Sequence, residues 1–419
     1  MHFIFCIILL LLEGTLTGKE SLDVVIIGAG HAGKGLCYAL QKEGIKNIAL
    51  FEAAQDGQES IWLTTARMNT LRSDKECVGP ALSQSHLTFR AWYESQGRLW
   101  EEIEKAPTHL WGEYLLWFGK TLNLPIFYEW KLLAIKPSQD GLDLIFDQNR
   151  TVHTKKVILA TGRDSFGGIS IPLPVKDLPK TFWYHTSERI NSALFRDKKI
   201  CVLGSGASGF DIAATAIESG SYHVDMLSRR EEVKTANYLF LHFKNWIQYF
   251  DLPDEEKVWL LHKAFQHGFC PPPDALKRVA FYPQFHLHLK TVIQYISPFE
   301  QGLILHTNQG NFTTDYLILA TGFQCNPFFV PQISGFVEAI LLWKDVIVDI
   351  PSELALFPYL GKSFEFMERT PGSAPFLKNI YCFNYGSYLS HGNTGIDIDQ
   401  FPIGAQRIVE GIKKELHKQ

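Results

Sequence analysis

Cysteine is scarce in this sequence, and no two cysteines lie close together. The seven cysteines are spread widely along the 419 residues, so a CxxC redox pair is absent, and their odd number argues against the disulfide framework of a secreted protein. The spacing of cysteine and histidine gives no metal site either. An excess of charge is also lacking: the net charge is −4, which gives no indication of a nucleic-acid partner.

The composition is that of a globular protein with more than one domain. Hydrophobic residues make up 46% of the chain and charged residues 20%, and 419 residues are long for one domain and comfortable for two. Aromatic residues reach 13%, and many fall in two stretches, Trp92 to Trp117 and Tyr238 to Phe250. Such stretches can enclose an apolar substrate, but we interpret each single aromatic residue as core.

A glycine motif of the form Gly-x-Gly-x-x-Gly occurs twice. The first copy spans Gly28 to Gly33 and the second Gly204 to Gly209, and each follows a short apolar run and opens a stretch with helical spacing. In strand–turn–helix units of this kind, glycines permit a tight turn and the close approach of a pyrophosphate to the helix N-terminus. Two copies therefore predict two bound dinucleotides. The predicted cofactor-binding residues of the motifs are Gly28, Gly30, Gly33, Gly204, Ser205, Gly206, Ser208 and Gly209.

The residues that follow the two motifs distinguish the two sites. Glu52 and Ser228 stand equally far after the first glycine of their motif. A carboxylate accepts hydrogen bonds from a ribose diol, as in an FAD site, whereas Ser228 with Arg229 and Arg230 suits the 2′-phosphate of NADPH. We therefore assign FAD to the first motif and NADPH to the second. The alternative is that the two arginines belong to a solvated charge cluster with the two glutamates that follow them.

A second repeat indicates how the domains are arranged. A predicted hairpin runs into a buried strand that ends in Ala-Thr-Gly at Thr161 and Gly162, and the pattern recurs at Thr321 and Gly322. We predict that these four residues bind cofactor and that the chain changes domain there. The predicted fold is α/β, with two Rossmann-like dinucleotide-binding domains, the NADPH domain being inserted into a discontinuous FAD domain. The predicted division is an apolar extension at 1–20, an FAD domain at 21–165 and 311–419, and an NADPH domain at 166–310 with a helical insertion within 233–290.

With these motifs placed, the chain resembles the class B flavin-dependent monooxygenases, which include flavin-containing monooxygenases, Baeyer–Villiger monooxygenases and lysine and ornithine N-hydroxylases. The run Ser208 to Ala213 is similar to the Ser-Gly-x-Asp-Ile-Ala pattern of that group, and Leu319 to Phe323 to its Ala-Thr-Gly-aromatic segment. Trp62 stands where a Gly-Gly-x-Trp segment is usual, although Gly57 alone precedes it here. The resemblance implies that Trp62 contacts the flavin cofactor.

Two further segments bear on the place of the chain within this group. Around His185 the monooxygenase fingerprint is partly kept, because Thr181 replaces its glycine and Arg189 its second aromatic residue. We interpret His185 as a packing residue. The C-terminal segment is similar to that of the N-hydroxylases, where an Asn and a His-Gly pair, here Asn384 and His391, precede the last helix. The resemblance implies that Asn384 binds the flavin and that His391 contacts its edge or holds the loop.

The resemblance implies a monooxygenase cycle. NADPH reduces FAD, O₂ adds to give a flavin hydroperoxide, and one oxygen passes to a nitrogen or sulfur centre of a small-molecule substrate. The last helix is predicted to begin near residues 400–403 with its N-terminus towards the flavin, where its dipole would stabilise the reduced ring. Two other functions stay open: an NADPH oxidase or reductase that passes electrons to a quinone, a protein or O₂, and a non-catalytic nucleotide-binding regulatory protein.

The catalytic candidates come mainly from the segment Arg67 to Ser73, which is predicted to pass the flavin face. Asn69 or Arg72 would hydrogen-bond the flavin or its oxygenated form, and His391 is the third candidate. For Arg72 the alternative is a surface ion pair with Asp74.

A continuous apolar run from Phe3 to Leu12 lies near the N-terminus. It is too short to span a bilayer, no Lys or Arg precedes it, and no clear cleavage site follows it. Because FAD and NADPH are cytosolic cofactors, we expect a cytoplasmic protein with an uncleaved extension, for which weak membrane association stays open. Export by a signal peptide is the alternative. The oligomeric state is left open.

Overall fold

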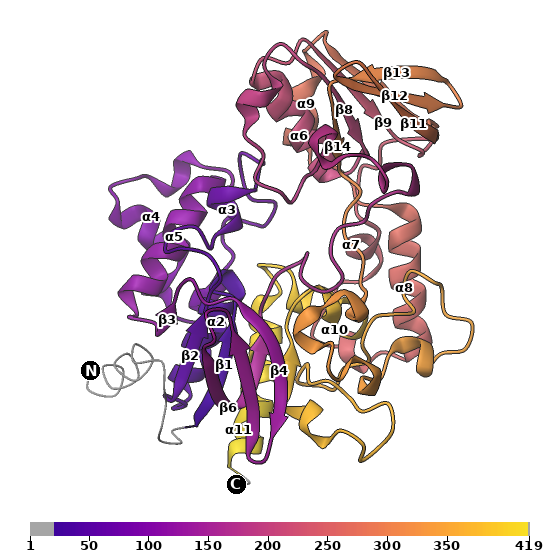
Figure 1. Cartoon of the computed structure of the whole chain (residues 1–419). Coiled ribbons are helices and arrows are strands. Elements are labelled where there is room, and N and C mark those ends of the chain that lie inside the picture. The colour runs from indigo at the N-terminus through magenta and orange to yellow at the C-terminus, as the bar shows by residue number, and fades with distance from the viewer. Residues whose placement is uncertain (1–20, 418–419) are drawn as a thin grey trace.

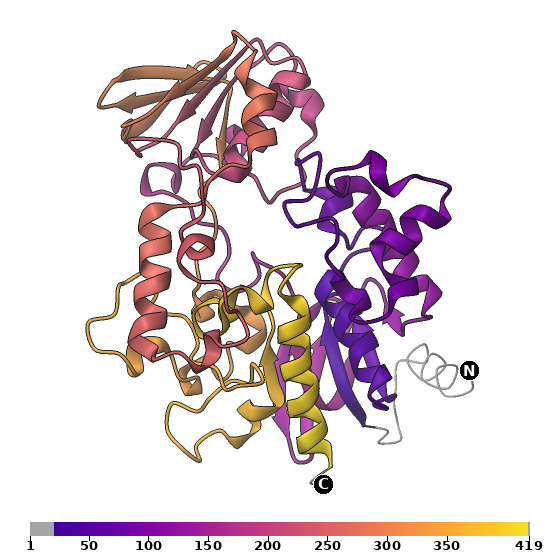
Figure 2. The ribbon, with the colours of Figure 1, turned by 180° about the vertical axis from the view of Figure 1, so that it is seen from behind.

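The computed structural model describes residues 21–417, which form two lobes (Figure 1). The N-terminal extension, with its apolar run, lies outside the described residues. Each lobe contains a mainly parallel sheet with helices, and the C-terminal part of the chain returns to the lobe that holds the N-terminal part (Figure 2). Within residues 21–417, no helix has the length and apolar character needed to cross a membrane.

The first lobe is built on a seven-stranded sheet. Its strand order is β3-β2-β1-β6-β5-β4, with β15 also paired to β6. The strands that run parallel to one another are β1, β2, β3, β6 and β15. The strand β5 pairs antiparallel with both β4 and β6. The bounds are β1 Leu22–Ile27, β2 Ile48–Phe51, β3 Ile126–Phe127, β4 Leu132–Ser138, β5 Gly141–Phe146, β6 Thr151–Leu159 and β15 Ile380–Cys382.

The second lobe holds a five-stranded parallel sheet and a three-stranded antiparallel one. The parallel sheet has the order β10-β9-β8-β14-β7, and the antiparallel sheet has the order β11-β12-β13. Leucines of β12 pack against the parallel sheet in one apolar cluster. The bounds are β7 Trp183–His185, β8 Lys199–Leu203, β9 His223–Leu227, β10 Phe285–His288, β11 Ile293–Phe299, β12 Gly302–Thr307, β13 Gly310–Thr314 and β14 Tyr316–Leu319.

The two parallel sheets repeat one another. In each sheet, the strand before the glycine motif pairs in parallel with the strand that follows the helix: β1 pairs with β2, and β8 pairs with β9. On the other side of the first strand, a strand from later in the chain completes each sheet, β6 in one lobe and β14 in the other. The predicted α/β fold with two Rossmann-like units is therefore confirmed, while the predicted domain boundaries stay predictions.

Helices flank both sheets. The helices α2 and α6 begin directly after the second glycine of their motifs, and α11 packs beside α2. Much of the region 233–290 belongs to the second lobe, because α9 packs on α6 and β10 pairs with β9, so the helical insertion is limited to α7 and α8. The bounds are α2 His31–Lys42, α3 Ile61–Thr64, α4 Phe89–Ser95, α5 Thr108–Thr121, α6 Ala207–Glu218, α7 Tyr238–His242, α8 Asp254–His267, α9 Pro273–Ala280, α10 Tyr388–His391 and α11 Phe401–Leu416.

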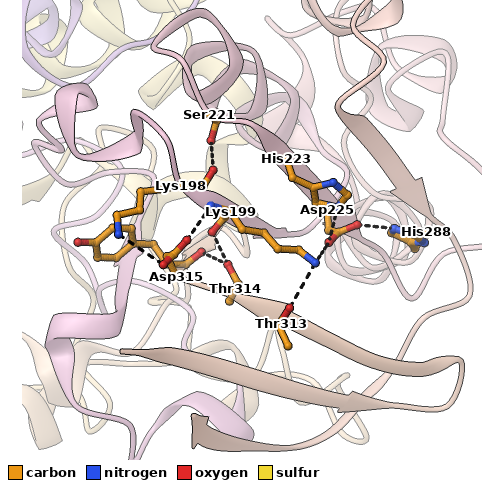
Figure 3. A network of polar contacts seen from close by, with 10 residues as sticks. Lys198, Lys199, Ser221, His223, Asp225, His288, Thr313, Thr314 and Asp315 are labelled. Atoms are coloured by element: carbon orange, nitrogen blue, oxygen red, sulfur yellow. Dashed lines mark hydrogen bonds and ion pairs between the residues drawn. The ribbon is translucent and has the colours of Figure 1, made fainter. Parts of the chain in front are cut away.

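A buried carboxylate lies at the centre of a polar network that reaches both sheets of the second lobe (Figure 3). Oxygens of Asp225 in β9 lie 2.8 Å from Nε2 of His288, 3.0 Å from Nε2 of His223 and 3.4 Å from Nζ of Lys199. Nζ of Lys199 also lies 3.4 Å from Oγ1 of Thr313 in β13. Burial alone would raise the pKa of Asp225, but the hydrogen bond from His288 and the charges of His223 and Lys199 bring that pKa below its ordinary value. The charged form of Asp225 is thus stabilised in the fold.

We expect Asp225→Asn to lower the free energy of unfolding by roughly 2 kcal/mol, because the partly buried Lys199, His223 and His288 would lose the carboxylate that they share. Glu231→Gln is the matched control, since Glu231 and its partner Lys290 are 81% and 61% exposed, and such exposed pairs contribute about 0–1 kcal/mol. Urea denaturation measures both. Because the pKa of Asp225 is lowered in the fold, the wild-type advantage should disappear as the pH falls through that pKa. Equal losses in the two variants would contradict this role of Asp225.

Candidate functional site

The two glycine loops share one geometry. The φ angle is +102° at Gly28 and +115° at Gly204, a conformation that residues other than glycine rarely adopt. A Cβ added at Gly28 would lie 2.5 Å from the carbonyl oxygen of Ala160, and one added at Gly204 would lie 2.5 Å from that of Ala320. Each loop therefore rests against the end of the strand that carries the Ala-Thr-Gly sequence.

The second and third glycines of each motif have different surroundings. At Gly33 and Gly209, an added Cβ would overlap the carbonyl oxygen of the first glycine of the same loop. At Gly30 no described atom lies within 4 Å of an added Cβ, and at Gly206 the nearest, the carbonyl oxygen of Phe269, is 3.6 Å away. The space in front of α2 and α6 is thus open, and no described side chain caps either helix. A pyrophosphate fits this arrangement of free N–H groups and open space.

Glu52 and Ser228 lie at matching places beside the two loops. Oε2 of Glu52 accepts a hydrogen bond from the N–H of Ala29 at 2.8 Å, and Oγ of Ser228 lies 2.7 Å from Oγ of Ser205. Ala29 and Ser205 each follow the first glycine of their motif, so the register expected from the sequence is present in the structure. A carboxylate beside one loop and a hydroxyl beside the other is the difference on which the assignment of two cofactors rests.

The two arginines after Ser228 differ in their surroundings. The guanidinium of Arg230 donates to the carbonyl oxygen of His267 at the end of α8, and a Cβ added at Gly268 would overlap that guanidinium. Arg229 is exposed and has no hydrogen-bond or ion-pair partner among the described residues. The two following glutamates pair with lysines and not with the arginines, while the phosphate-binding role of the arginines stays a prediction.

In each lobe, strand ends lie beside the glycine loop, those of β6 and β15 in the first lobe and that of β14 in the second. In the first lobe, Nδ2 of Asn384 donates to Oγ1 of Thr161 at 3.1 Å and to the carbonyl oxygen of Leu159 at 3.2 Å. In the second lobe, Oγ1 of Thr321 donates to the carbonyl oxygen of Ser170 at 2.5 Å. These contacts place the predicted cofactor residues at the carboxyl ends of β6, β14 and β15, namely Thr161, Gly162, Thr321, Gly322 and Asn384.

An imidazole lies inside the first motif within an aromatic cage. His31, the first residue of α2, is 7% exposed, and its ring centroid lies 6.2 Å from that of Trp62, 5.8 Å from that of Trp111 and 4.9 Å from that of Phe401. Burial lowers the pKa of His31 to about 3. Phe401 begins α11, as predicted, so the N-terminus of this helix reaches the first glycine motif. Sequence reasoning missed His31, because this residue occupies a variable position of the motif.

Buried polar atoms without partners gather around this cage. Both ring nitrogens of His31, Nε1 of Trp111, Oγ1 of Thr108 and Oγ of Ser60 have no hydrogen-bond partner among the described residues. Ser60 precedes α3 and Thr108 begins α5, and these two helices pack together. Because buried polar atoms are satisfied in most structures, a group of unsatisfied ones beside a glycine loop fits a site for a polar ligand such as FAD.

Two of the catalytic candidates lie on a segment between the lobes. The carbonyl oxygen of Asn69 accepts a hydrogen bond from the N–H of Thr108 at 3.0 Å, and the Asn69 side chain is exposed. Nη2 of Arg72 lies 2.6 Å from Oδ2 of Asp211 in α6. The alternative pairing of Arg72 with Asp74 is therefore wrong, because the segment runs along the second lobe, which provides a buried carboxylate.

The two histidines singled out in the sequence are fully buried. The ring of His391 stacks on that of Phe364 at 3.6 Å, its Nε2 donates to the carbonyl oxygen of Gly361 at 3.0 Å, and its Nδ1 lies 3.3 Å from Nη1 of Arg407. Burial, together with the charge of Arg407, lowers the pKa of His391 well below its ordinary value. This environment favours the role of holding the loop over contact with the flavin. Burial lowers the pKa of His185 to about 4, in keeping with a packing role.

Comparison with known proteins extends these observations. A family model described as pyridine nucleotide-disulphide oxidoreductase matches residues 25–250. FAD-dependent urate hydroxylase of Xanthomonas campestris pv. campestris is 31% identical over 405 residues, which cover 94% of this chain and 86% of the relative. L-lysine 6-monooxygenase from Pseudomonas syringae superposes with a TM-score of 0.74 at 19% identity, over 94% of this chain and 99% of that one. Ornithine hydroxylase from Pseudomonas aeruginosa does so with a TM-score of 0.73 at 18% identity, over 94% and 100%.

The fold, the two loops and these likenesses define a flavoprotein monooxygenase of class B, the class that the sequence resembles. The chain belongs to the pyridine nucleotide-disulphide oxidoreductase family. The prediction of an enzyme is confirmed, and the family description and the name of the urate hydroxylase agree with the predicted nicotinamide and FAD cofactors. All cysteines among residues 21–417 are free, so the described part of the chain holds no disulfide.

We expect Gly30→Val and Gly33→Ala to fail in different ways. Gly30 has an ordinary φ of −71° and open space in front of it, so valine should leave the apoprotein folded and block the pyrophosphate of FAD. Alanine at position 33 would overlap the carbonyl oxygen of Gly28 and should destabilise the fold itself. Visible absorbance measures bound flavin, and thermal unfolding measures stability. A Gly30→Val protein with wild-type flavin content would show that the first loop does not hold FAD.

Proposed function

We propose that this protein is an FAD-dependent, NADPH-consuming monooxygenase that oxygenates a nitrogen centre of a small molecule. The observation that carries this proposal is the pair of matched glycine loops with different partners. Glu52 stands beside one loop, and Ser228 with the unpaired Arg229 beside the other. A dinucleotide with an unmodified ribose suits the first arrangement, and one with a 2′-phosphate suits the second.

The relatives support the substrate class. By name, the relative that matches 94% of this chain hydroxylates urate, and the two structural neighbours act on lysine and ornithine. Urate is a nitrogen-rich heterocycle, and the two amino acids carry side-chain amines. All three are small molecules that contain nitrogen. A hydroxylase matched over nearly the whole chain also disfavours the alternatives of an oxidase and of a non-catalytic protein.

The residues of the chain would supply surroundings rather than acid–base groups. Bound FAD provides the redox chemistry, since a flavin accepts hydride and reacts with O₂. We place the N-terminus of α11 next to the flavin, where N–H groups of a helix start stabilise negative charge. Asn69 and Arg72 are proposed to line the flavin face. Because their pKa values are lowered, His31, His185 and His391 are neutral near pH 7 and do not supply protons there.

Coupled turnover tests this proposal. The FAD-loaded protein is mixed with NADPH in air, together with urate, L-ornithine or L-lysine, and the consumed NADPH, released H₂O₂ and oxygenated product are measured. We expect one of these substrates, or a close analogue, to gain an oxygen atom while the H₂O₂ released per NADPH falls. H₂O₂ equal to the NADPH consumed with every nitrogen compound would identify an oxidase. A flavin that anaerobic NADPH does not bleach would identify a non-catalytic protein.

We expect substitutions of Arg229 and Arg230 to have different effects on the choice between NADPH and NADH. Arg229→Ala should raise the KM for NADPH by about 10- to 100-fold, as expected for the loss of a charge-assisted hydrogen bond, with little change for NADH. Arg230→Ala should in addition lower the thermal stability, because Arg230 caps the end of α8. Steady-state flavin reduction with both nucleotides, with a melting curve for each variant, distinguishes the two roles. Equal losses for NADPH and NADH in Arg229→Ala would refute the 2′-phosphate contact.

A further inference from the structure

A set of charged contacts crosses between the lobes beside the predicted flavin face. Nη2 of Arg72, on the segment after α3, lies 2.6 Å from Oδ2 of Asp211 in α6. Nη1 of Arg278 in α9 lies 3.7 Å from Oδ1 of the same carboxylate and donates to the carbonyl oxygen of Arg67 at 2.8 Å. The Asp211 side chain is 6% exposed. A buried carboxylate of the second lobe therefore holds a guanidinium of the first lobe.

Two more arginines make the contact continuous. The guanidinium of Arg67 donates to the carbonyl oxygens of Thr186 at 2.6 Å and Glu188 at 2.8 Å, both just after β7 in the second lobe. Arg189 reaches in the opposite direction and donates to the carbonyl oxygen of Gln58 at 3.0 Å. Both views show the part of the chain around α3 reaching towards the second lobe (Figures 1 and 2). The second lobe thus holds the segment from residue 58 to residue 72 at Gln58, Arg67 and Arg72.

These contacts lie between the two predicted cofactors. Asp211 is in the second turn of α6, the helix that begins at the second glycine motif, where we place NADPH. Arg72 is on the segment predicted to pass the flavin face. The ion pair of Asp211 with Arg72 therefore connects the helix at one cofactor with the segment at the other. Hydride transfer needs its two rings in near contact, and a displacement of about 1 Å can cost on the order of 100-fold in rate.

We propose that Asp211 and Arg278 are positioning residues that clamp the segment after α3 to the second lobe and thereby set the approach of NADPH to FAD. Neither residue is assigned contact with a cofactor. The step they serve is hydride transfer: two electrons and a proton leave the nicotinamide of NADPH together, NADP⁺ is formed and the flavin is reduced. This inference rests on the proposed function, because that function supplies both cofactors.

The clamp differs from an ordinary surface ion pair. Arg278 is 11% exposed on its side chain and also forms a two-point pair with Glu218, at 2.9 and 2.8 Å. Burial raises the pKa of Asp211, and the charges of Arg72 and Arg278 oppose that rise. The carboxylate thus depends on its two arginines, and removing either partner should loosen the contact across the lobes.

Rapid mixing of the anaerobic, FAD-loaded protein with NADPH tests the clamp. We expect Asp211→Asn and Arg278→Met to lower the limiting rate of flavin reduction by about 10- to 100-fold, while the Kd for NADPH and the flavin content stay near wild type. Hydrogen exchange of the peptides that cover residues 58–74 should become faster. Because Arg72→Lys keeps the positive charge, NADPH should reduce the flavin of this variant faster than the flavin of Arg72→Met. Glu94→Gln is the control, since Glu94 and Arg90 form an exposed pair within one helix.

Each outcome decides the proposal. A wild-type limiting rate in Asp211→Asn and Arg278→Met would overturn the clamp, and so would a raised Kd for NADPH with an unchanged limiting rate. If wild-type flavin is not reduced by NADPH, the proposed function fails, and unchanged hydrogen exchange in the variants would then overturn the clamp separately. Should Asp211→Asn not fold, Arg278→Met carries the test, because Arg278 is assigned no contact with a cofactor and holds the segment through the carbonyl oxygen of Arg67.

Discussion

The close approach of each glycine loop to the end of a neighbouring strand is the constraint on which the rest of the structure depends. Gly28 and Gly204 leave no room for a Cβ beside the carbonyl oxygens of Ala160 and Ala320, residues that lie far away in the sequence. This contact fixes where each helix begins, and hence where its free N–H groups point. Glu52 and Ser228 can occupy matching positions because both loops are held in the same way.

Although the two lobes repeat one topology, different structures pack beside their parallel sheets. In the first lobe the aromatic cage around His31 and the start of α11 lie against the glycine loop. In the second lobe, the Asp225 cluster ties the parallel sheet to the three-stranded one. Between the lobes, the described contacts of Arg67 and Arg72 are polar, and polar interfaces permit relative movement more readily than apolar ones. Arginines at this boundary therefore bear directly on the distance between the two cofactors.

Sequence reasoning succeeded where the signal was local. The glycine motifs, the equal spacing of Glu52 and Ser228 and the start of α11 all follow from short patterns in the chain. It failed where the partner comes from another part of the fold, as in the pairing of Arg72 with Asp211 and the capping of α8 by Arg230. The run of prolines at 271–273 gives a misleading local signal, because Pro273 begins α9, a position that proline tolerates since its missing N–H would be unpaired there anyway.

The titration of the buried groups explains why positioning matters more here than acid–base chemistry. Burial keeps His31, His185 and His391 neutral near pH 7. Asp399, just before α11, is different, since burial and the charge of Asp397 raise its pKa to about 6. When a carboxylate ionises next to the start of α11, its negative charge weakens the positive potential that the helix N-terminus would exert on a reduced flavin. With most neighbouring groups fixed in charge, the rate of a flavin reaction depends on how closely the donor, the flavin and the substrate are held, and that geometry is set by the contacts between the lobes.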